Sequence, residues 1–205
     1  MFDLPPPVPA IEFNLASTGI SKGLAQTRGP QLLARGELAF GQVYFGGYAK
    51  NVTSATTDGE AAALAGLRFT ASGFDLGASA AWKRAIDPAR GSDANALELG
   101  GSVSRRVGRV TPRLSLVWSP DDLGSTRRTL FAEAGAGYRF SKAFTASAAL
   151  GRRERSGGAD YTAWNAGVAW SVEKRLTVDL RYYDTDGGND HPFRPRAVLS
   201  ARAKF

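Results

Sequence analysis

The chain has 205 residues, no cysteine and a net charge of +7. The lack of cysteine excludes disulfide bonds and thiolate metal sites, and no apolar run is long enough for a membrane-spanning helix of about 20 residues. The basic residues are scattered singly, which argues against a nucleic-acid partner and leaves an anionic membrane surface or an anionic solute.

The chain starts with the proline-rich segment MFDLPPPVPA. This segment lacks the basic and apolar regions of a secretory signal. We expect residues 1–9 to form an extended lead-in and residues 10–205 to form a single domain.

After the lead-in, apolar and polar residues alternate along nearly the whole chain. In GFDLGASAAW, residues 73–82, Phe74, Leu76 and Trp82 share one face. A period of two is that of a β-strand with one apolar and one polar face. The pattern predicts twelve strands, at residues 10–22, 31–40, 42–51, 60–71, 73–83, 96–107, 109–118, 129–140, 143–152, 161–171, 175–183 and 195–205.

The connections between these strands alternate between short and long. The short ones are turns such as Gly41, Ser72-Gly73 and Gly108, whereas the long ones are polar segments, at residues 25–30, 52–59, 84–95, 119–128, 153–160 and 184–194. All long loops therefore leave one end of the sheet. This pattern is typical of bacterial outer-membrane barrels. It predicts an all-β fold, a transmembrane antiparallel up-and-down β-barrel with short periplasmic turns and longer extracellular loops.

The apolar faces of the predicted strands carry aromatic residues near both ends and Ala, Leu and Val between them. Two aromatic bands around an aliphatic belt are typical of a lipid-facing surface, because indole rings prefer the depth of the headgroups. From Phe74 to Trp82 the strand covers about 27 Å, which fits such a belt once the strand is tilted. We expect the following residues at the membrane interfaces: Phe40, Phe69, Phe74, Trp82, Trp118, Phe140, Phe144, Trp164, Trp170, Tyr182 and Phe205.

The opposite faces carry many charged residues, for example Glu37, Asp75 and Arg113. Unpaired charges in a dry core would cost several kcal/mol each, so this face needs water or ion pairs. The alternative is a soluble sandwich or a lipocalin-like barrel with its apolar face turned inward. Sandwich cores usually hold more large aliphatic residues than these Ala-rich stripes, so we expect the apolar face to contact lipid.

The last predicted strand reads RAVLSARAKF and ends in Phe205. A terminal aromatic residue on an alternating strand resembles the signal by which outer-membrane proteins are recognised for insertion. An ordinary edge strand that ends in Phe is the alternative. We expect the barrel-insertion machinery as a partner of this strand, and the lipid bilayer with lipopolysaccharide as the surroundings of the barrel.

Three segments, together with the closing strand, resemble the TorF family of porin-like proteins: GISKGLAQT (19–27), VYFGGYAKNV (43–52) and YTAWNAGVAWSVEKRLTVDLRYYDTD (161–186). That family shows an Arg-Gly-Ile-Ser-like first hairpin, a Gly-aromatic second hairpin and a Tyr-Thr-x-Trp to Tyr-Tyr-Asp-Thr-Asp ending. This sequence departs from it at Lys22, near where the family often carries Arg, and at Ala163, where Asp is common. The resemblance implies an outer-membrane barrel and suggests a pore, without naming a solute.

The sequence does not favour an enzyme, although phospholipases and lipid A deacylases use barrels of this size. The single histidine, His191, lies in a loop, and a lone histidine lacks the partners that nucleophilic catalysis needs. DTDGGND (184–190) resembles a calcium loop but lacks the ligand spacing of one. The adjacent Asp121 and Asp122 show no reason to form a catalytic pair. We expect no catalytic residues, no metal and no cofactor.

The inward face combines small residues with an excess of basic ones. By parity, twelve bases, including Lys22, Lys50 and Lys204, share this face with seven acids. A basic lumen favours anions, so the sequence predicts a porin-like channel for passive diffusion of small anionic solutes. The alternative is a closed structural or adhesion barrel that binds a partner through its loops. The residues expected to line the pore and set its selectivity are Arg35, Arg68, Lys83, Arg106, Arg113, Arg139, Arg153, Arg181 and Arg202.

Overall fold

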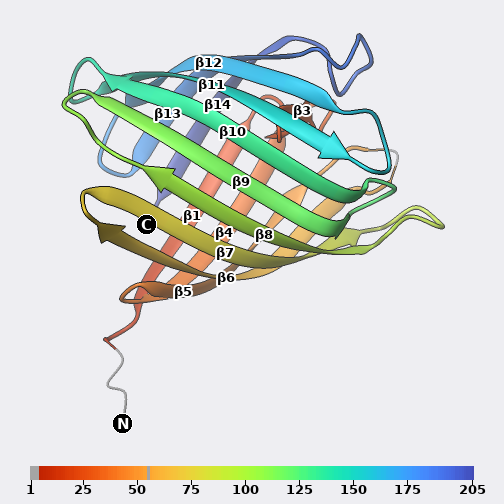
Figure 1. Ribbon diagram of the computed structural model, residues 1–205, viewed down its shortest axis with the longest axis horizontal. Helices are drawn as coiled ribbons and strands as arrows, with labels where there is room; N and C mark the ends of the chain where they lie inside the picture. Colours follow the sequence, from red (N-terminus) through yellow and green to blue (C-terminus); the bar gives the residue numbers. More distant parts are fainter. Residues whose placement is uncertain (1–4, 55) are drawn as a thin grey trace.

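The computed structural model describes residues 5–54 and 56–205, which form a closed β-barrel (Figure 1). Residues 1–4, part of the expected lead-in, lie outside the described residues, as does Ala55. No helix in the described part is long and apolar enough to cross a membrane. Twelve antiparallel strands make up the wall, so the predicted fold class and strand number are confirmed.

The wall closes through its first strand, which pairs with two neighbours. Phe13 lies opposite Ala34 on one side and Ala203 on the other. Closure leaves no open edge of unpaired backbone groups, which lipid could not satisfy. The wall strands are β1 (Val8–Ala16), β4 (Gln31–Phe40), β5 (Val43–Asn51), β6 (Gly59–Ala71), β7 (Phe74–Ile86), β8 (Asn95–Ser104), β9 (Val110–Asp122), β10 (Arg127–Arg139), β11 (Phe144–Arg155), β12 (Tyr161–Ser171), β13 (Leu176–Thr185) and β14 (Arg196–Lys204).

Short connections lie at one end of the barrel and long ones at the other, as the sequence predicts. Between β6 and β7, Ser72 and Gly73 both have positive φ, 51° and 76°. This is the geometry of a type I′ turn, whose twist suits an antiparallel hairpin. We name the two ends the short-turn end and the long-loop end. In outer-membrane barrels the short turns are periplasmic.

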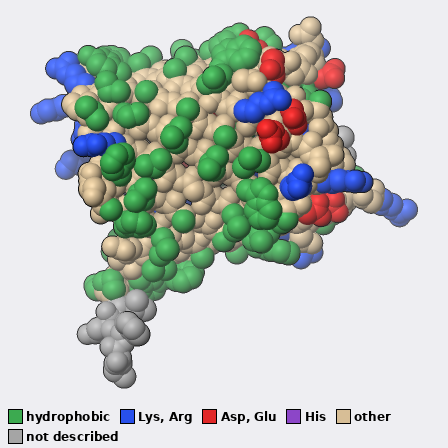
Figure 2. Space-filling view, in the orientation of Figure 1, with side chains coloured by type: hydrophobic (Ala, Val, Ile, Leu, Met, Phe, Trp, Pro, Cys, Tyr) green, Lys and Arg blue, Asp and Glu red, His purple; other side chains and the backbone are tan. Residues whose placement is uncertain are grey.

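The outer surface of the wall is apolar. Leu114, Leu116 and Leu150 are each more than half exposed, and all of the eleven expected interface aromatics except Phe40 are exposed. Figure 2 shows green side chains over the wall and charged ones gathered at its two ends. The soluble alternative, with the apolar face turned inward, is therefore wrong.

The expected first strand, residues 10–22, differs from the structure. β1 ends at Ala16, and the chain then forms a small hairpin of β2 (Ile20–Ser21) and β3 (Leu24–Ala25). Lys22 and Gly23 form its turn with positive φ, 50° and 82°. We name residues 17–30 the inserted loop. Its backbone turns where the alternation alone predicts a continued strand.

Candidate functional site

The lumen is the candidate functional site, because the register places the charged residues on its inner wall. Glu12 lies opposite Arg35 and Lys204 on the neighbouring strands. Side chains of a strand alternate, so one inward residue fixes the inward set of the whole strand. The charged side chains of the lumen form two groups, one toward each end.

A buried ion-pair cluster lies toward the long-loop end. Lys22 of the inserted loop contacts Glu98 of β8 at 2.5 Å and Asp122 of β9 at 3.1 Å. Lys83 of β7 contacts the same two carboxylates at 2.9 and 2.7 Å. Arg153 of β11 adds a contact of 2.8 Å to Asp122. Three cations thus share two carboxylates, and charges buried to this degree need such partners.

The inserted loop is held in place by the buried ion-pair cluster and by β12. Tyr161 of β12 is fully buried and donates a hydrogen bond of 2.7 Å to the carbonyl oxygen of Lys22. A Cβ atom on Gly23 would overlap that of Ala163, so the turn of the hairpin lies directly against the wall. The inserted loop therefore lies within the long-loop end of the lumen.

The other arm of the inserted loop is held by hydrogen bonds to the wall and to loops. The side-chain oxygen of Gln26 accepts a hydrogen bond from Lys50 Nζ at 2.7 Å, and the backbone carbonyl oxygen of Gln26 accepts one from the backbone N–H of Thr53. The N–H of Ala25 donates to the carbonyl oxygen of Pro192, in the β13–β14 loop. Both arms of the loop are fixed.

A second buried group extends the cluster along β5 and β6. Lys50 Nζ lies 3.3 Å from Glu60, and Tyr48 Oη donates to the same carboxylate at 2.5 Å. These residues, like the cluster above, belong to the long-loop half of their strands. Among the described residues of this half, the inward charges are satisfied by one another rather than left open to a solute.

The short-turn end of the lumen is different, because its basic side chains are exposed. Arg68 and Arg113 each have 55% of the side chain exposed, and Lys204 has 62%. Their partners Glu37 and Glu133 are more covered, at 11% and 20%. Water and solutes at this end therefore meet mainly positive groups.

Between the two ends, Arg181 is held by four hydrogen bonds. It donates two to Asp179 and one each to Asn165 and Ser147, at 2.8 to 3.1 Å. The side chain is 14% exposed. Its charge acts from a fixed position on the wall.

Two other predicted basic residues lie at the edge of the barrel. Arg106 lies in the β8–β9 connection, beyond the end of β8, and Arg139 is the last residue of β10. Both are exposed. Neither has an ion pair with a described residue.

Asp122 and Tyr161 have roles that the sequence reasoning missed. Asp122 was expected to be an ordinary loop residue, whereas it ends β9 and is the centre of the buried cluster. A bulge in β9 comes just before it, because Thr129 lies opposite Ser119 and Arg127 opposite Asp122, which leaves one extra residue in β9. The parity count reads a face only along a regular strand, so a carboxylate at a bulged end falls outside it.

Three arginines surround His191 at the outer rim of the long-loop end. Partial burial lowers the pKa of His191, and so do the positive charges of Arg196, Arg28 and Arg194 nearby. A protonated imidazole is disfavoured by that surrounding charge. The positive charge at this rim is therefore local to the surroundings of His191.

The acidic residues of DTDGGND (184–190) support the loop. Asp186 accepts the backbone N–H of Thr162 at 2.6 Å, and Asp184 accepts that of Thr185 at 2.8 Å. Across the described residues, no three His, Cys, Asp or Glu side chains come together as a metal-binding group.

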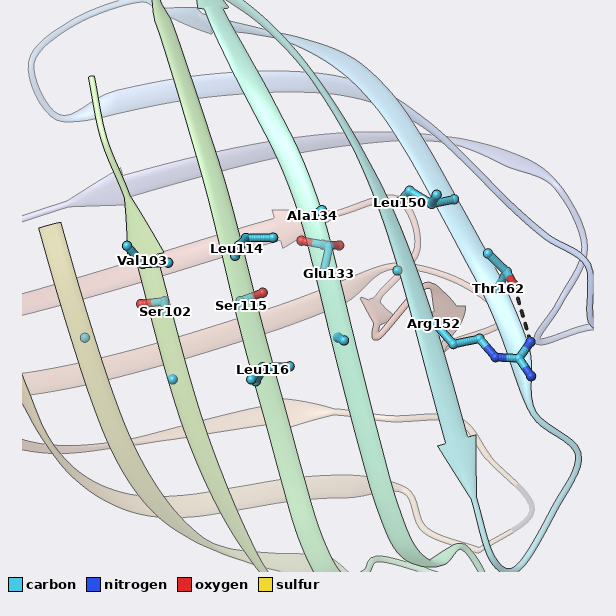
Figure 3. A pocket seen from close by; sticks show the side chains of 14 residues that line it. Ser102, Val103, Leu114, Ser115, Leu116, Glu133, Ala134, Leu150, Arg152 and Thr162 are labelled. Atoms are coloured by element: carbon cyan, nitrogen blue, oxygen red, sulfur yellow. Dashed lines mark hydrogen bonds between the residues drawn. The ribbon is translucent and has the colours of Figure 1, made fainter. Parts of the chain in front are cut away.

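A depression of about 660 Å³ crosses the wall over β7 to β12 (Figure 3). Its outward residues include Leu114, Leu116 and Leu150, and Arg152 donates to Thr162 at one end. Such an apolar hollow on the outside of the wall faces the hydrocarbon of the membrane. It is not a solute site of the lumen.

Comparisons with known proteins agree with this fold. A family model described as "Bacterial protein of unknown function (Gcw_chp)" matches residues 34–200. No curated protein matches the chain in sequence.

Solved structures with the same fold include a KdgM porin, with a TM-score of 0.67 and 11% identity over 96% of this chain and 99% of that one. A NanC porin has a TM-score of 0.61 and 6% identity over 96% and 98%. The COG4313 outer-membrane channel of Pseudomonas putida F1 has a TM-score of 0.52 and 11% identity over 100% and 96%. The barrel thus has the fold of bacterial outer-membrane porins.

Proposed function

The chain belongs to the Gcw_chp family of bacterial proteins of unknown function, and we propose that it is a porin-like channel for the passive diffusion of small, preferentially anionic solutes. The observation that carries this proposal is the exposed basic surface in the short-turn half of the lumen. There Arg68 and Arg113 are half exposed while their acidic partners are largely covered. In a narrow, low-dielectric lumen such a surface concentrates anions.

The inserted loop narrows the path at the other end. Its hairpin lies against Ala163 and is tied to the buried ion-pair cluster through Lys22. A path that passes such a loop admits small solutes only. The three arginines near His191 add positive charge at the outer mouth.

A second candidate function is a closed barrel that binds a partner through its loops. The ion pairs of the lumen favour it, since ten of the twelve bases expected there have a carboxylate partner within 4.0 Å. A barrel whose inward charges are largely paired with one another can stay closed to water. Conductance distinguishes the two functions.

The proposal includes the finer expectations from the sequence. The chain is a member of the TorF porins and is not an enzyme, and residues 10–205 act as one domain. Its aromatic bands lie at the two membrane interfaces, with lipopolysaccharide around the outer one. The strand that ends in Phe205 binds the insertion machinery.

The test is conductance of the refolded protein in a planar bilayer, with the reversal potential measured across a salt gradient. We expect discrete steps and a reversal potential that indicates anion preference. In the double variant Arg68→Glu, Arg113→Glu the preference shifts toward cations, whereas Lys174→Glu, in the β12–β13 turn, leaves it unchanged. Oligogalacturonate, with which a KdgM porin was solved, is one anionic probe for block of the current.

If a folded and inserted sample shows no conductance steps, the channel function is overturned and the closed barrel is favoured. Steps without any effect of the double variant would remove the role of the two arginines in selectivity.

A further inference from the structure

We propose that the short-turn mouth of the lumen contains a binding site for one compact oxyanion, a phosphate group, formed by Arg35, Arg68, Arg202 and Lys204. The site lies where β14, β1, β4 and β6 contribute inward side chains. A cavity of about 200 Å³ there is lined by Glu12, Glu37 and three of the four bases. It goes beyond the proposed function, because binding at this mouth does not require a path through the barrel.

The charges at this cavity do not balance. Glu37 is shared by Arg35, at 3.2 Å, and by Arg68. Glu12 is shared by Arg202, at 3.6 Å, and by Lys204, at 3.2 Å. One cation for each carboxylate would neutralise the pair, so two positive charges are left over. A phosphate carries a charge of about −1.5 to −2 at neutral pH, which matches this surplus.

The two carboxylates are covered, whereas the four cationic groups of the site are open to water in the lumen. Glu37 and Glu12 are 11% and 24% exposed, whereas the four basic side chains are 38 to 62% exposed. The basic groups thus keep N–H donors available for a ligand. Arginine forks match the oxygens of phosphate in geometry as well as in charge.

Arg68 is positioned for this role by the ring of Tyr44. Its guanidinium lies 4.1 Å from the ring centroid, and Tyr44 is only 8% exposed. The ring itself occupies space that a side chain on Gly66 would take. The ring supports one face of the guanidinium, which limits the entropy that Arg68 loses when it binds an anion. The nearby Asp75 accepts a hydrogen bond from Thr70 and does not line the cavity.

The experiment is isothermal titration of inorganic phosphate into the full chain, refolded in zwitterionic detergent with chloride as the background salt. We expect saturable binding of one phosphate per barrel. Arg68→Gln weakens it by about tenfold or more, because a charge-assisted hydrogen bond is lost. Glu37→Gln tightens it, because a competing carboxylate is removed from two arginines.

Matched controls separate this site from the overall charge. Lys142→Gln and Glu173→Gln change the net charge by the same amounts in turns of the short-turn end, and both leave the affinity unchanged. Circular dichroism and the heat-dependent gel mobility of the barrel show that each variant is folded.

Absence of saturable binding, or equal losses in Arg68→Gln and Lys142→Gln, would overturn the site. A barrel that binds phosphate but carries no current keeps the site and loses the channel. A barrel that conducts but does not bind phosphate keeps the channel and loses the site.

Discussion

At the scale of single residues, the carboxylate of Asp122 is the shared partner of three basic side chains at the long-loop end. Its side chain is 6% exposed, and it contacts Lys22, Lys83 and Arg153. It also accepts the backbone N–H of Leu123 at 2.9 Å. Removing one partner from a buried ionic group leaves the remaining charges without compensation, which costs far more than an exposed ion pair contributes.

We therefore expect Asp122→Asn to lower the free energy of unfolding by about 3–5 kcal/mol. The measurement is urea unfolding of the refolded barrel, followed by tryptophan fluorescence. Asp121→Asn is the control, because Asp121 is exposed next to it on the chain and has no ion pair with a described residue. Equal effects of both variants would contradict the central place of Asp122.

Gly23 provides a residue-scale test of the inserted loop. A Cβ atom there would overlap that of Ala163, and φ is +82°, which disfavours other residues. We expect Gly23→Ala to push the hairpin off the wall and to raise the single-channel conductance. The control is Gly29→Ala, in the same loop, where a Cβ would meet nothing within 4 Å. An unchanged conductance with Gly23→Ala would show that the hairpin does not limit the current.

The sequence predicts which residues of the site face the lumen, because side chains alternate between the two faces of a strand. Parity alone assigns Arg68 and Arg113 to the inner face, and the register agrees. Parity says nothing about which inward residues meet across the lumen. The contact of Lys22 with Glu98, 76 positions away, depends on how the loop folds back. The same is true of the bond from Tyr161 to Lys22.

At the scale of elements, the inserted loop is the part of the fold that restricts the lumen. It leaves the wall after Ala16 and returns at Gln31, and these two residues are paired neighbours in β1 and β4. The wall therefore does not need the loop for its closure. Residues 17–30 can be exchanged for a two-residue turn that suits a hairpin.

We expect a variant with Asn-Gly in place of residues 17–30 to fold and to conduct several-fold more current per channel than the full chain, because its long-loop end is cleared. The matched control shortens the β7–β8 loop, residues 87–94, whose backbone bonds to other loops go to Thr56 and Gly124. That control keeps the original conductance. Unchanged conductance without the inserted loop would show that the cluster itself closes the lumen.

The sequence predicts an element correctly where its strand is regular. The prediction fails where the chain turns within an alternating segment. The alternation through Ile20 and Lys22 favours one long first strand, and the hairpin instead reverses the chain at Lys22 and Gly23. Gly23 adopts positive φ without steric cost, whereas Lys22 does so at roughly 1–2 kcal/mol. The contacts with Tyr161 and Asp122 then decide between the two arrangements, and these contacts are not local in sequence.

At the scale of the whole molecule, the barrel separates its polar and apolar groups in the reverse of a soluble protein. Inward Glu133 and Arg113 form an ion pair of 2.9 Å, while their neighbours Ala134 and Leu114 face outward. The sequence carries this reversal in its aromatic bands and aliphatic belt. The charged ends and the apolar wall of Figure 2 show the same division on the folded molecule.

A basic residue in the middle of that wall tests the lipid contact directly. Leu116 lies at the centre of the outward row of β9 and is 54% exposed. We expect Leu116→Arg to lower the free energy of unfolding in lipid vesicles by about 2–4 kcal/mol, the cost of arginine at the bilayer midplane. Val110→Arg, at the short-turn end of the same strand, costs about 0–1 kcal/mol. Equal costs at the two positions would mean that this wall is not in contact with the hydrocarbon, because only a bilayer makes the cost depend on depth.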